Sequence, residues 1–261
     1  MPDRTNYFLK ITPLEGGGAV IQILKDKPLP QGHINSEAMW IAGVLTDDGC
    51  IYYMPFHASH ILRLDPNNSD SLSLVGENLG YADYGVAVLS NDGFIYGIPS
   101  GGLNLIKYNP RTNSTDIIEE ALRDNHFYLG GVTAADGNIY SLNEYGQVLK
   151  ICTCNNQCSL IGDRINYKDG LGWGLPVLGD DKCIYFPPYV HNRSLHFNPI
   201  SQDISLIGEL YEGDDNVWAD GILASDGYIY CAPFNSNNIL LIDTRHFNKQ
   251  VIEFVQKMGG H

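Results

Sequence analysis

Five aromatic residues recur at nearly equal spacing and are the first candidates for contact with a ligand. An aromatic ring offers an apolar face that can stack on the CH face of a sugar or hold a cation. Each of the five lies eleven residues before an Ile-Tyr pair, and they include all three tryptophans of the protein: Trp40, Tyr84, Tyr128, Trp173 and Trp218. The alternative is that these rings are packing residues between repeats, which is the commoner role of a repeated aromatic.

Short segments after prolines carry a second group of aromatic and polar side chains. Variable loops on a repeated framework are common binding sites. From these segments we select Phe56, His57, Tyr189, Phe234 and Asn235 as ligand-contacting residues. Polar side chains near the aromatic column, which would supply hydrogen bonds, are Glu37, Asp83, Asp124, Asp169 and Asp215.

Three cysteines in seven residues, Cys152, Cys154 and Cys158, could bind zinc with a fourth ligand or form one disulfide. Their spacing matches no strong zinc motif and no histidine neighbours them, so we favour free thiols in a turn. The other cysteines, Cys50, Cys183 and Cys231, flank Ile-Tyr pairs and are expected to be small apolar core residues. We therefore predict no bound metal and no cofactor.

The elements that must position these residues follow from a repeat. The Ile-Tyr pairs begin at residues 51, 95, 139, 184 and 229, so their spacings are 44, 44, 45 and 45 residues, and an aspartate precedes each pair by three positions. Residues 40–76 contain four short β-rich runs separated by turns such as Asp48-Gly49 and Asp65-Pro66. This pattern predicts a four-stranded antiparallel meander in each repeat, with the aspartates forming turns and the tyrosines packing.

Four-stranded meanders repeated at this length indicate an all-β fold, a β-propeller in which each sheet is one blade around a channel. Residues 226–230 (DGYIY) followed by 238–244 (NILLIDT) resemble the YVTN-type propeller repeat. The aromatic columns and Gly130-Gly131 are also similar to kelch-like repeats. The resemblance covers residues 38–255 and implies the architecture. It does not imply catalytic residues, because these families include scaffolds, lectin-like binders and a few enzymes.

We predict one domain, residues 1–261, with blades at 38–81, 82–125, 126–170, 171–215 and 216–255. Residues 1–30 resemble the outer half of a repeat and are expected to form a β-hairpin. Five complete blades plus this hairpin is the favoured arrangement. The alternatives are a six-bladed propeller with a half blade and a fragment of a longer propeller. Within a blade, the Asp-Gly and Asp-Pro turns should share one face, and the aromatic column and post-proline segments should share the other.

The charge of the chain restricts its partners. A formal net charge of −14 disfavours nucleic acid and membrane surfaces, and it tolerates neutral or cationic ligands and basic proteins. No apolar run approaches the ~20 residues of a membrane span, and residues 1–8 do not resemble a signal peptide. We therefore expect a cytoplasmic protein.

The functional hypothesis is a non-enzymatic binding module that recognises a neutral or cationic small molecule, a glycan or a protein on the face with the aromatics. One alternative is a metal-assisted, lactonase-like hydrolase with its site at the central channel. Glu37, Glu144 and Asp220 are its possible acidic residues, although they form no repeated column. The other alternative is a structural scaffold fragment. No nucleophile elbow or phosphate-binding glycine loop supports another enzyme class.

Overall fold

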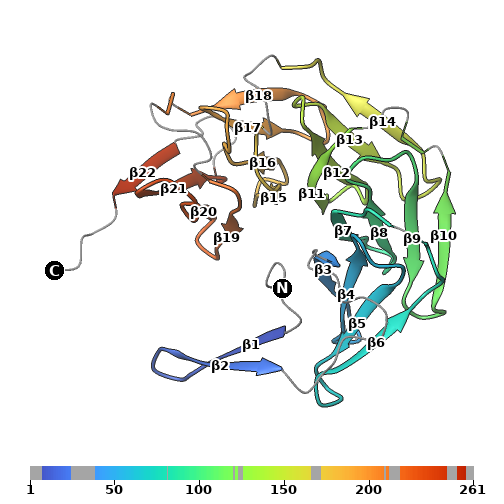
Figure 1. The fold of residues 1–261 in the computed structure, drawn as a ribbon. Coiled ribbons are helices and arrows are strands. Elements are labelled where there is room, and N and C mark those ends of the chain that lie inside the picture. Colours follow the sequence, from blue (N-terminus) through green and yellow to red (C-terminus); the bar gives the residue numbers. More distant parts are fainter. Residues whose placement is uncertain are drawn as a thin grey trace. The chain divides into compact units, whose positions relative to one another are not determined.

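A computed structural model describes the residues 8–24, 39–80, 82–119, 121–122, 126–165, 172–208, 210–211, 218–245 and 252–256. All regular secondary structure in these residues is β-strand, as the repeat predicts (Figure 1). The described residues contain no helix that could cross a membrane. The strands form five four-stranded antiparallel sheets, each with its strands in sequence order, and one two-stranded sheet. Each predicted repeat contains one four-stranded sheet.

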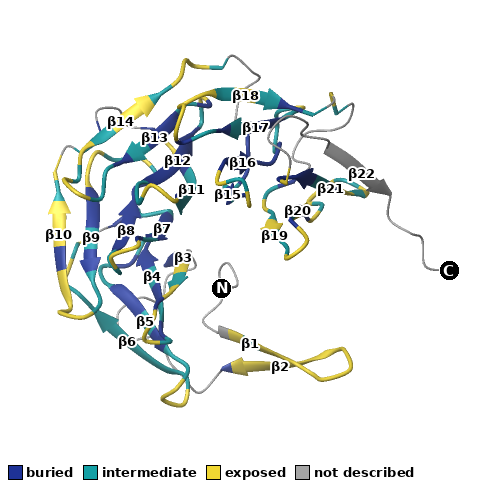
Figure 2. Ribbon diagram, turned by 180° about the vertical axis from the view of Figure 1, so that it is seen from behind, coloured by how far each residue is buried: buried dark blue, intermediate teal, exposed yellow. Residues whose placement is uncertain are grey.

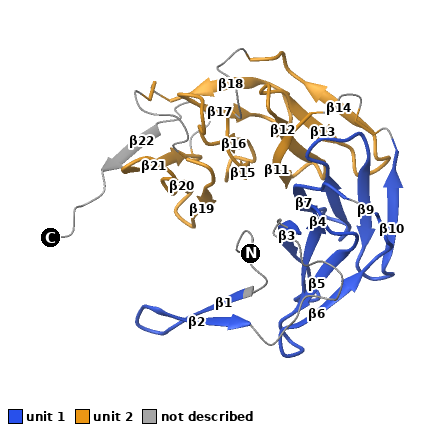
Figure 3. Ribbon diagram, in the orientation of Figure 1, with its two compact units in different colours: residues 1–119 blue, residues 120–261 orange. Residues whose placement is uncertain are grey.

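The chain divides into two compact units, residues 1–119 and 120–261 (Figure 3). Unit 1 begins with the hairpin of β1 (Phe8–Pro13) and β2 (Ala19–Leu24). Sheet 1 consists of β3 (Trp40–Leu45), β4 (Ile51–Pro55), β5 (Ile61–Asp65) and β6 (Ser71–Val75). Sheet 2 consists of β7 (Val86–Leu89), β8 (Ile95–Ile98), β9 (Leu105–Asn109) and β10 (Ser114–Ile118).

Unit 2 contains the remaining three sheets. Sheet 3 consists of β11 (Tyr128–Thr133), β12 (Ile139–Asn143), β13 (Val148–Ile151) and β14 (Cys158–Ile161). Sheet 4 consists of β15 (Val177–Leu178), β16 (Ile184–Phe186), β17 (Ser194–Phe197) and β18 (Ile204–Ile207). Sheet 5 consists of β19 (Ile222–Leu223), β20 (Tyr228–Cys231), β21 (Asn238–Asp243) and β22 (Ile252–Gln256).

Within each unit, neighbouring sheets bury their apolar faces against one another, and the middle strands are the most buried (Figure 2). In unit 1, Tyr52 and Met54 of sheet 1 share a core cluster with Ile106 and Tyr108 of sheet 2. In unit 2, one cluster joins sheets 3 and 4, and a second joins sheets 4 and 5. Because a buried apolar side chain contributes about 1.5–3 kcal/mol, these clusters are the main source of stability.

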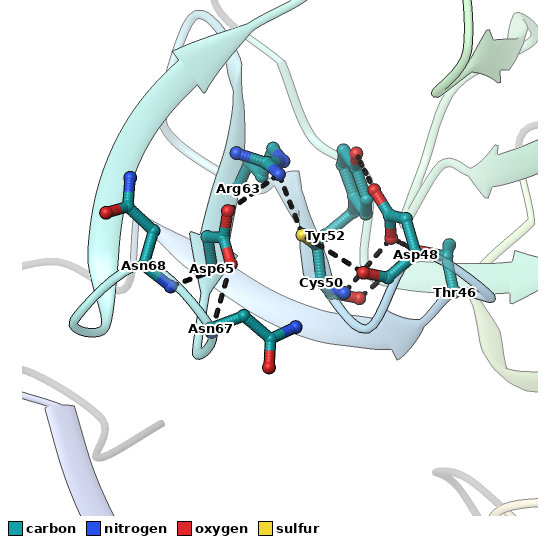
Figure 4. A network of polar contacts seen from close by, with 8 residues as sticks. All are labelled: Thr46, Asp48, Cys50, Tyr52, Arg63, Asp65, Asn67 and Asn68. Atoms are coloured by element: carbon teal, nitrogen blue, oxygen red, sulfur yellow. Dashed lines mark hydrogen bonds and ion pairs between the residues drawn. The ribbon is translucent and has the colours of Figure 1, made fainter.

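The repeated aspartate organises the turn between the first two strands of each sheet. In sheet 1, Asp48 Oδ1 accepts hydrogen bonds from the Cys50 backbone N–H (3.0 Å) and the Thr46 hydroxyl (2.5 Å), and Oδ2 accepts one from the Tyr52 hydroxyl (3.1 Å; Figure 4). The same tyrosine-to-aspartate bond joins residues 140 and 136, 185 and 181, and 230 and 226, at 2.7–2.8 Å. The aspartates are turn formers, as predicted, and in sheets 1, 3, 4 and 5 they also hold the next strand through the tyrosine.

Hydrogen bonds in sheets 1, 3 and 4 agree with the predicted division of a sheet into two ends. At one end of sheet 3 the turn between β13 and β14 meets the turn between β11 and β12, since the Thr153 hydroxyl donates to the Gly137 carbonyl (2.9 Å). At the other end, the loop after β4 meets the entry to β3, where the backbone N–H groups of Phe56 and His57 donate to the Met39 carbonyl (2.9 and 3.3 Å). In sheet 4, Tyr189 N–H donates to the Gly172 carbonyl in the corresponding way (3.1 Å).

Sheet 4 departs from the repeat at its first turn. Glycine occupies the position after the aspartate in the other four sheets, with φ of 77–85°. Lys182 occupies it in sheet 4 with φ of 67°, a left-handed conformation that disfavours side chains. The turn still closes, because Lys182 N–H donates to the Gly179 carbonyl (3.0 Å) and Cys183 N–H donates to Asp181 Oδ1 (3.1 Å).

The β1–β2 hairpin has one strongly apolar face. Its cross-strand pairs Leu9–Ile23 and Ile11–Ile21 are all at least 47% exposed. On the other face, Leu24 is buried in a cluster with residues of sheet 1, and Lys10 forms an ion pair with Asp70 (2.9 Å). The hairpin predicted for residues 1–30 is therefore present as strands β1 and β2.

The bond between Tyr140 and Asp136 predicts a pH-dependent contribution to stability. Burial alone would raise the pKa of Asp136, but hydrogen bonds from Asn138 and Tyr140 outweigh it and hold the pKa below its usual value. A lowered carboxyl pKa adds stability that is complete above the unfolded-state pKa, about 3.9, and is lost as the pH falls through the folded-state pKa.

We therefore expect Tyr140→Phe to lower the free energy of unfolding by about 1–3 kcal/mol at neutral pH, and by less below about pH 3.9. Urea denaturation at both pH values measures this difference. Tyr230→Phe is the matched control, because Tyr230 makes the same bond but is 37% exposed, and its effect should be smaller. Equal losses of unfolding free energy for both variants at both pH values would contradict a pH-dependent contribution from the Tyr140–Asp136 bond.

Candidate functional site

The three tryptophans of the aromatic column are core residues. Trp40, Trp173 and Trp218 are each at most 2% exposed. Each indole N–H donates to the backbone carbonyl twenty residues further on, at the start of the third strand or just before it: His60, Arg193 and Asn238, at 2.9–3.0 Å. Each of the three belongs to a core cluster, the ring of Trp173 also stacks on His191 (centroids 4.6 Å apart), and Trp218 packs with residues of both sheets 4 and 5. The stacking platform considered from the sequence is not available at these three residues, because their rings are covered.

The two tyrosines of the column are also mostly covered. Tyr128 is 2% exposed, and burial raises the pKa of the half-buried Tyr84 to about 12. Tyr84 N–H donates to the Pro55 carbonyl (3.0 Å), and Trp218 N–H donates to the Pro188 carbonyl (3.2 Å). The start of one sheet is thus bonded to the loop after the second strand of the preceding sheet in the same unit. The aromatic column is an inter-sheet packing element.

The post-proline residues of unit 2 form an accessible aromatic pair. The rings of Tyr189 and Phe234, which follow Pro188 and Pro233, are 6.1 Å apart between centroids and inclined at 54°. Phe234 is 63% exposed, Tyr189 is half-buried and Asn235 is exposed. These three predicted residues come from the loops of adjacent sheets and form one patch, which we call the unit 2 loop patch.

The post-proline residues of unit 1 lie near a carboxylate. Phe56 and His57 are half-buried, with ring centroids 4.3 Å apart. Asp83 Oδ1 is buried without a hydrogen-bond partner, and burial raises the pKa of Asp83 while the charge of His57 opposes this effect. Asp83 is held by its own backbone, since its carbonyl accepts the Ser100 N–H (2.8 Å). We call Phe56, His57 and Asp83 the unit 1 loop patch.

The remaining polar candidates do not converge. Both Glu144 carboxylate oxygens are engaged within sheet 3 and the residues before it, one by His126 Nδ1 (3.3 Å) and the other by Phe127 N–H (2.8 Å). Asp220 is exposed and accepts the N–H of Gly221 (2.7 Å). Glu37, Asp124, Asp169 and Asp215 lie outside the described residues.

The three clustered cysteines are not a set of donors gathered within 4.8 Å of one another. Cys152 and Cys154 share a thiol hydrogen bond, which lowers the pKa of Cys152 and raises that of Cys154. Cys158 stands apart, with its pKa raised to about 11 by burial and its thiol near the Asn156 carbonyl (3.8 Å). Among the described residues, the one set of three donor side chains gathered within 4.8 Å is Asp181, Cys183 and His196, which sequence reasoning did not select.

Two hollows lie away from the loop patches. One, of about 320 Å³ in unit 2, is lined by the predicted residues Tyr128 and Cys158 together with Leu122, Leu149 and Leu160. The other, of about 430 Å³ in unit 1, lies among the turns of sheets 1 and 2 and is lined by Asp47, Asp48 and Arg111. The lining of the first hollow includes three leucines, and that of the second includes two aspartates and an arginine.

Comparison with solved structures defines the fold. Virginiamycin B lyase from Staphylococcus aureus is 13% identical over 97% of this chain and 75% of the lyase, with a TM-score of 0.70. A streptogramin B lyase is 14% identical over 100% and 85% of the two chains, with a TM-score of 0.71. A Bacteroides uniformis protein provisionally named a 6-phosphogluconolactonase is 14% identical over 97% and 78%, with a TM-score of 0.68.

The class of protein follows from these likenesses and from the five meander sheets: the chain has a β-propeller fold. Identities of 13–14% establish the fold alone. No protein-family model and no curated protein sequence matches the chain. The similarity to YVTN-type and kelch-like repeats therefore stays a prediction at the level of the repeat family.

The burial of Trp218 predicts a structural phenotype. Trp218→Ala should lower the free energy of unfolding by about 3–5 kcal/mol, because it removes a fully buried aromatic ring. Trp218→Phe should cost less, since it keeps a ring but loses the bond to the Asn238 carbonyl. Chemical denaturation measures both changes. A Trp218→Ala variant as stable as the wild type would show that the ring is not a core residue.

Proposed function

We propose that this β-propeller is a non-enzymatic binding module that holds a neutral or cationic ligand at the loops after the second strands. The observation that carries the proposal is the aromatic pair of the unit 2 loop patch. Phe234 is 63% exposed and rests against Tyr189, whereas the tryptophans of the same two sheets are buried. An accessible ring beside exposed polar groups is the arrangement that binds the CH face of a sugar or an alkylammonium group.

Electrostatics support the same ligand class. The formal charge of −14 repels anionic ligands. In the unit 1 loop patch, Asp83 has a buried carboxylate oxygen without a partner, and leaving such an acceptor unsatisfied costs about 1–3 kcal/mol. A ligand hydroxyl or ammonium group would satisfy this oxygen, so the patch favours a hydrogen-bond donor.

The hydrolase alternative has less support in the described residues. Lyase and lactonase names among the solved structures of this fold keep an enzyme under consideration. However, Glu144 is engaged by its neighbours and Asp220 is exposed, so neither supports a carboxylate site for a catalytic ion, and Glu37 lies outside the described residues. The scaffold alternative predicts that substitution of the exposed loop aromatics changes the binding of no ligand.

A panel of immobilised neutral oligosaccharides and alkylammonium compounds tests the binding proposal. We expect the wild type to bind at least one of these probes. Phe234→Ala and Tyr189→Ala should each weaken that binding by about 5–30-fold, the effect of 1–2 kcal/mol, with unchanged melting temperature. Ile200→Ala is the matched control, because Ile200 is 88% exposed but lies in the turn between β17 and β18, at the other end of sheet 4.

Asp83→Asn tests the unit 1 loop patch separately from the unit 2 loop patch. This change removes a desolvated charge, so the melting temperature should rise or stay constant while the binding of a cationic probe falls. Full binding by the Phe234→Ala and Tyr189→Ala variants would exclude the unit 2 loop patch as the site. Failure of the wild type to bind any probe would favour the scaffold alternative.

A further inference from the structure

Sheet 4 brings together a carboxylate, a thiol and an imidazole. Asp181 lies in the turn before β16, Cys183 directly precedes β16, and His196 lies on β17. One ligand atom from each side chain lies within 4.8 Å of the other two. Cys183 is 2% exposed, and the other two side chains are half-buried, so the cluster borders the core but is open to solvent on one side.

The other repeats provide an internal comparison for this cluster. His196 pairs across the strands with Tyr185, and the equivalent partners of Tyr52, Tyr96 and Tyr140 are all permanently cationic. These partners are Arg63, Lys107 and Lys150. Among the first four sheets, only sheet 4 has histidine in place of lysine or arginine opposite the repeated tyrosine. A neutral histidine can be a metal ligand.

Sheet 1 is the nearest equivalent, because it also has a cysteine two residues after the aspartate. There, Arg63 Nη2 donates to Cys50 Sγ (2.8 Å) and to Asp65 Oδ2 (3.0 Å), so the guanidinium lies between the thiol and the carboxylate of Asp65 (Figure 4). Asp48, the equivalent of Asp181, is instead bonded by the Thr46 and Tyr52 hydroxyls. In sheet 4 the corresponding thiol, Cys183, faces a histidine, and Asn198 stands at the position of Asp65. A metal cation would supply beside this thiol the positive charge that arginine supplies beside Cys50 in sheet 1.

The surrounding hydrogen bonds orient the carboxylate and the imidazole. Asp181 accepts the Tyr185 hydroxyl at Oδ2 (2.7 Å) and the Cys183 N–H at Oδ1 (3.1 Å), which fixes the carboxylate plane. His196 Nδ1 contacts the Ser205 hydroxyl (3.2 Å), which leaves Nε2 as the ligand atom. Outer partners of this kind fix the ring orientation of metal-binding histidines and raise metal affinity.

We infer that Asp181, Cys183 and His196 bind a zinc ion. A thiolate and an imidazole favour zinc over magnesium or calcium, which prefer oxygen ligands. Three protein ligands leave one tetrahedral position for water or an added ligand. Binding would release the Cys183 thiol proton to solvent, since the thiolate is the ligand form. The ion would tie the β15–β16 turn, with its left-handed Lys182, to β17.

Cobalt and zinc binding to the full chain test the inference. The background carries Cys152→Ser and Cys154→Ser, because these thiols are accessible and could bind metal by themselves. We expect Co²⁺ to give a thiolate charge-transfer band that Zn²⁺ abolishes, with about one equivalent bound. Zn²⁺ should also raise the melting temperature, because it binds only the folded protein.

Two substitutions use the internal comparison. His196→Arg places beside Cys183 the cation that sheet 1 has beside Cys50, with Asn198 in the place of Asp65. The fold should persist while zinc affinity falls by more than the ~10–100-fold typical of lost outer partners. Arg63→His gives sheet 1 the full donor set, and Ser73 already pairs with residue 63 as Ser205 does with His196. This variant should bind a second equivalent.

Each result bears directly on the inference. Loss of the charge-transfer band in Cys183→Ser and loss of zinc binding in a folded His196→Arg variant would support the site. Unchanged zinc binding in His196→Arg, or no thiolate band with Co²⁺ in the parent chain, would overturn it. An Arg63→His variant that folds but binds no second ion would show that this residue set does not make a zinc site.

Discussion

The structure depends on one repeated interaction, in which an aspartate carboxylate closes a β-turn and accepts the hydroxyl of a tyrosine four residues later. One oxygen bonds the turn backbone and the other bonds the tyrosine, as in the Asp136–Tyr140 pair. The tyrosine ring then lies between sheets, where Tyr52 contacts Tyr108 and Tyr140 contacts Phe197. A local turn thereby sets the position of an inter-sheet contact, and the apolar clusters form around it.

Much of the fold could be predicted from the sequence because its signals are local and repeated. The Asp-Gly turns, the short β-rich runs and the period of 44–45 residues determine the meanders. The role of the aromatic column could not be determined in this way. Whether Trp218 is a platform or a core residue depends on which side chains of the preceding sheet cover its ring and on its bond to the Asn238 carbonyl. Both are tertiary contacts.

The candidate sites were only partly visible in the sequence for the same reason. Phe234 and Tyr189 were predicted, since they follow prolines at equivalent positions, but their contact required two sheets to be placed side by side. Asp181, Cys183 and His196 were missed as a group because His196 is thirteen residues from Cys183 and their proximity depends on strand register. An alignment of the residues opposite each repeated tyrosine would have pointed to the cluster. Sheets 1 to 3 have Arg63, Lys107 and Lys150 at this position, and sheet 4 has a histidine.

Every four-stranded sheet pairs only strands that are consecutive in the chain. Each of its contacts therefore closes a short loop, and the loop-closure entropy of each step is small compared with that of folds whose strands pair over long distances. Each sheet can form as a separate unit during synthesis of the chain. Its apolar faces then remain exposed to solvent until the next sheet packs against them. The order in which sheets dock therefore controls how long these faces are open to aggregation, and the aliphatic face of the β1–β2 hairpin is exposed even in the folded structure.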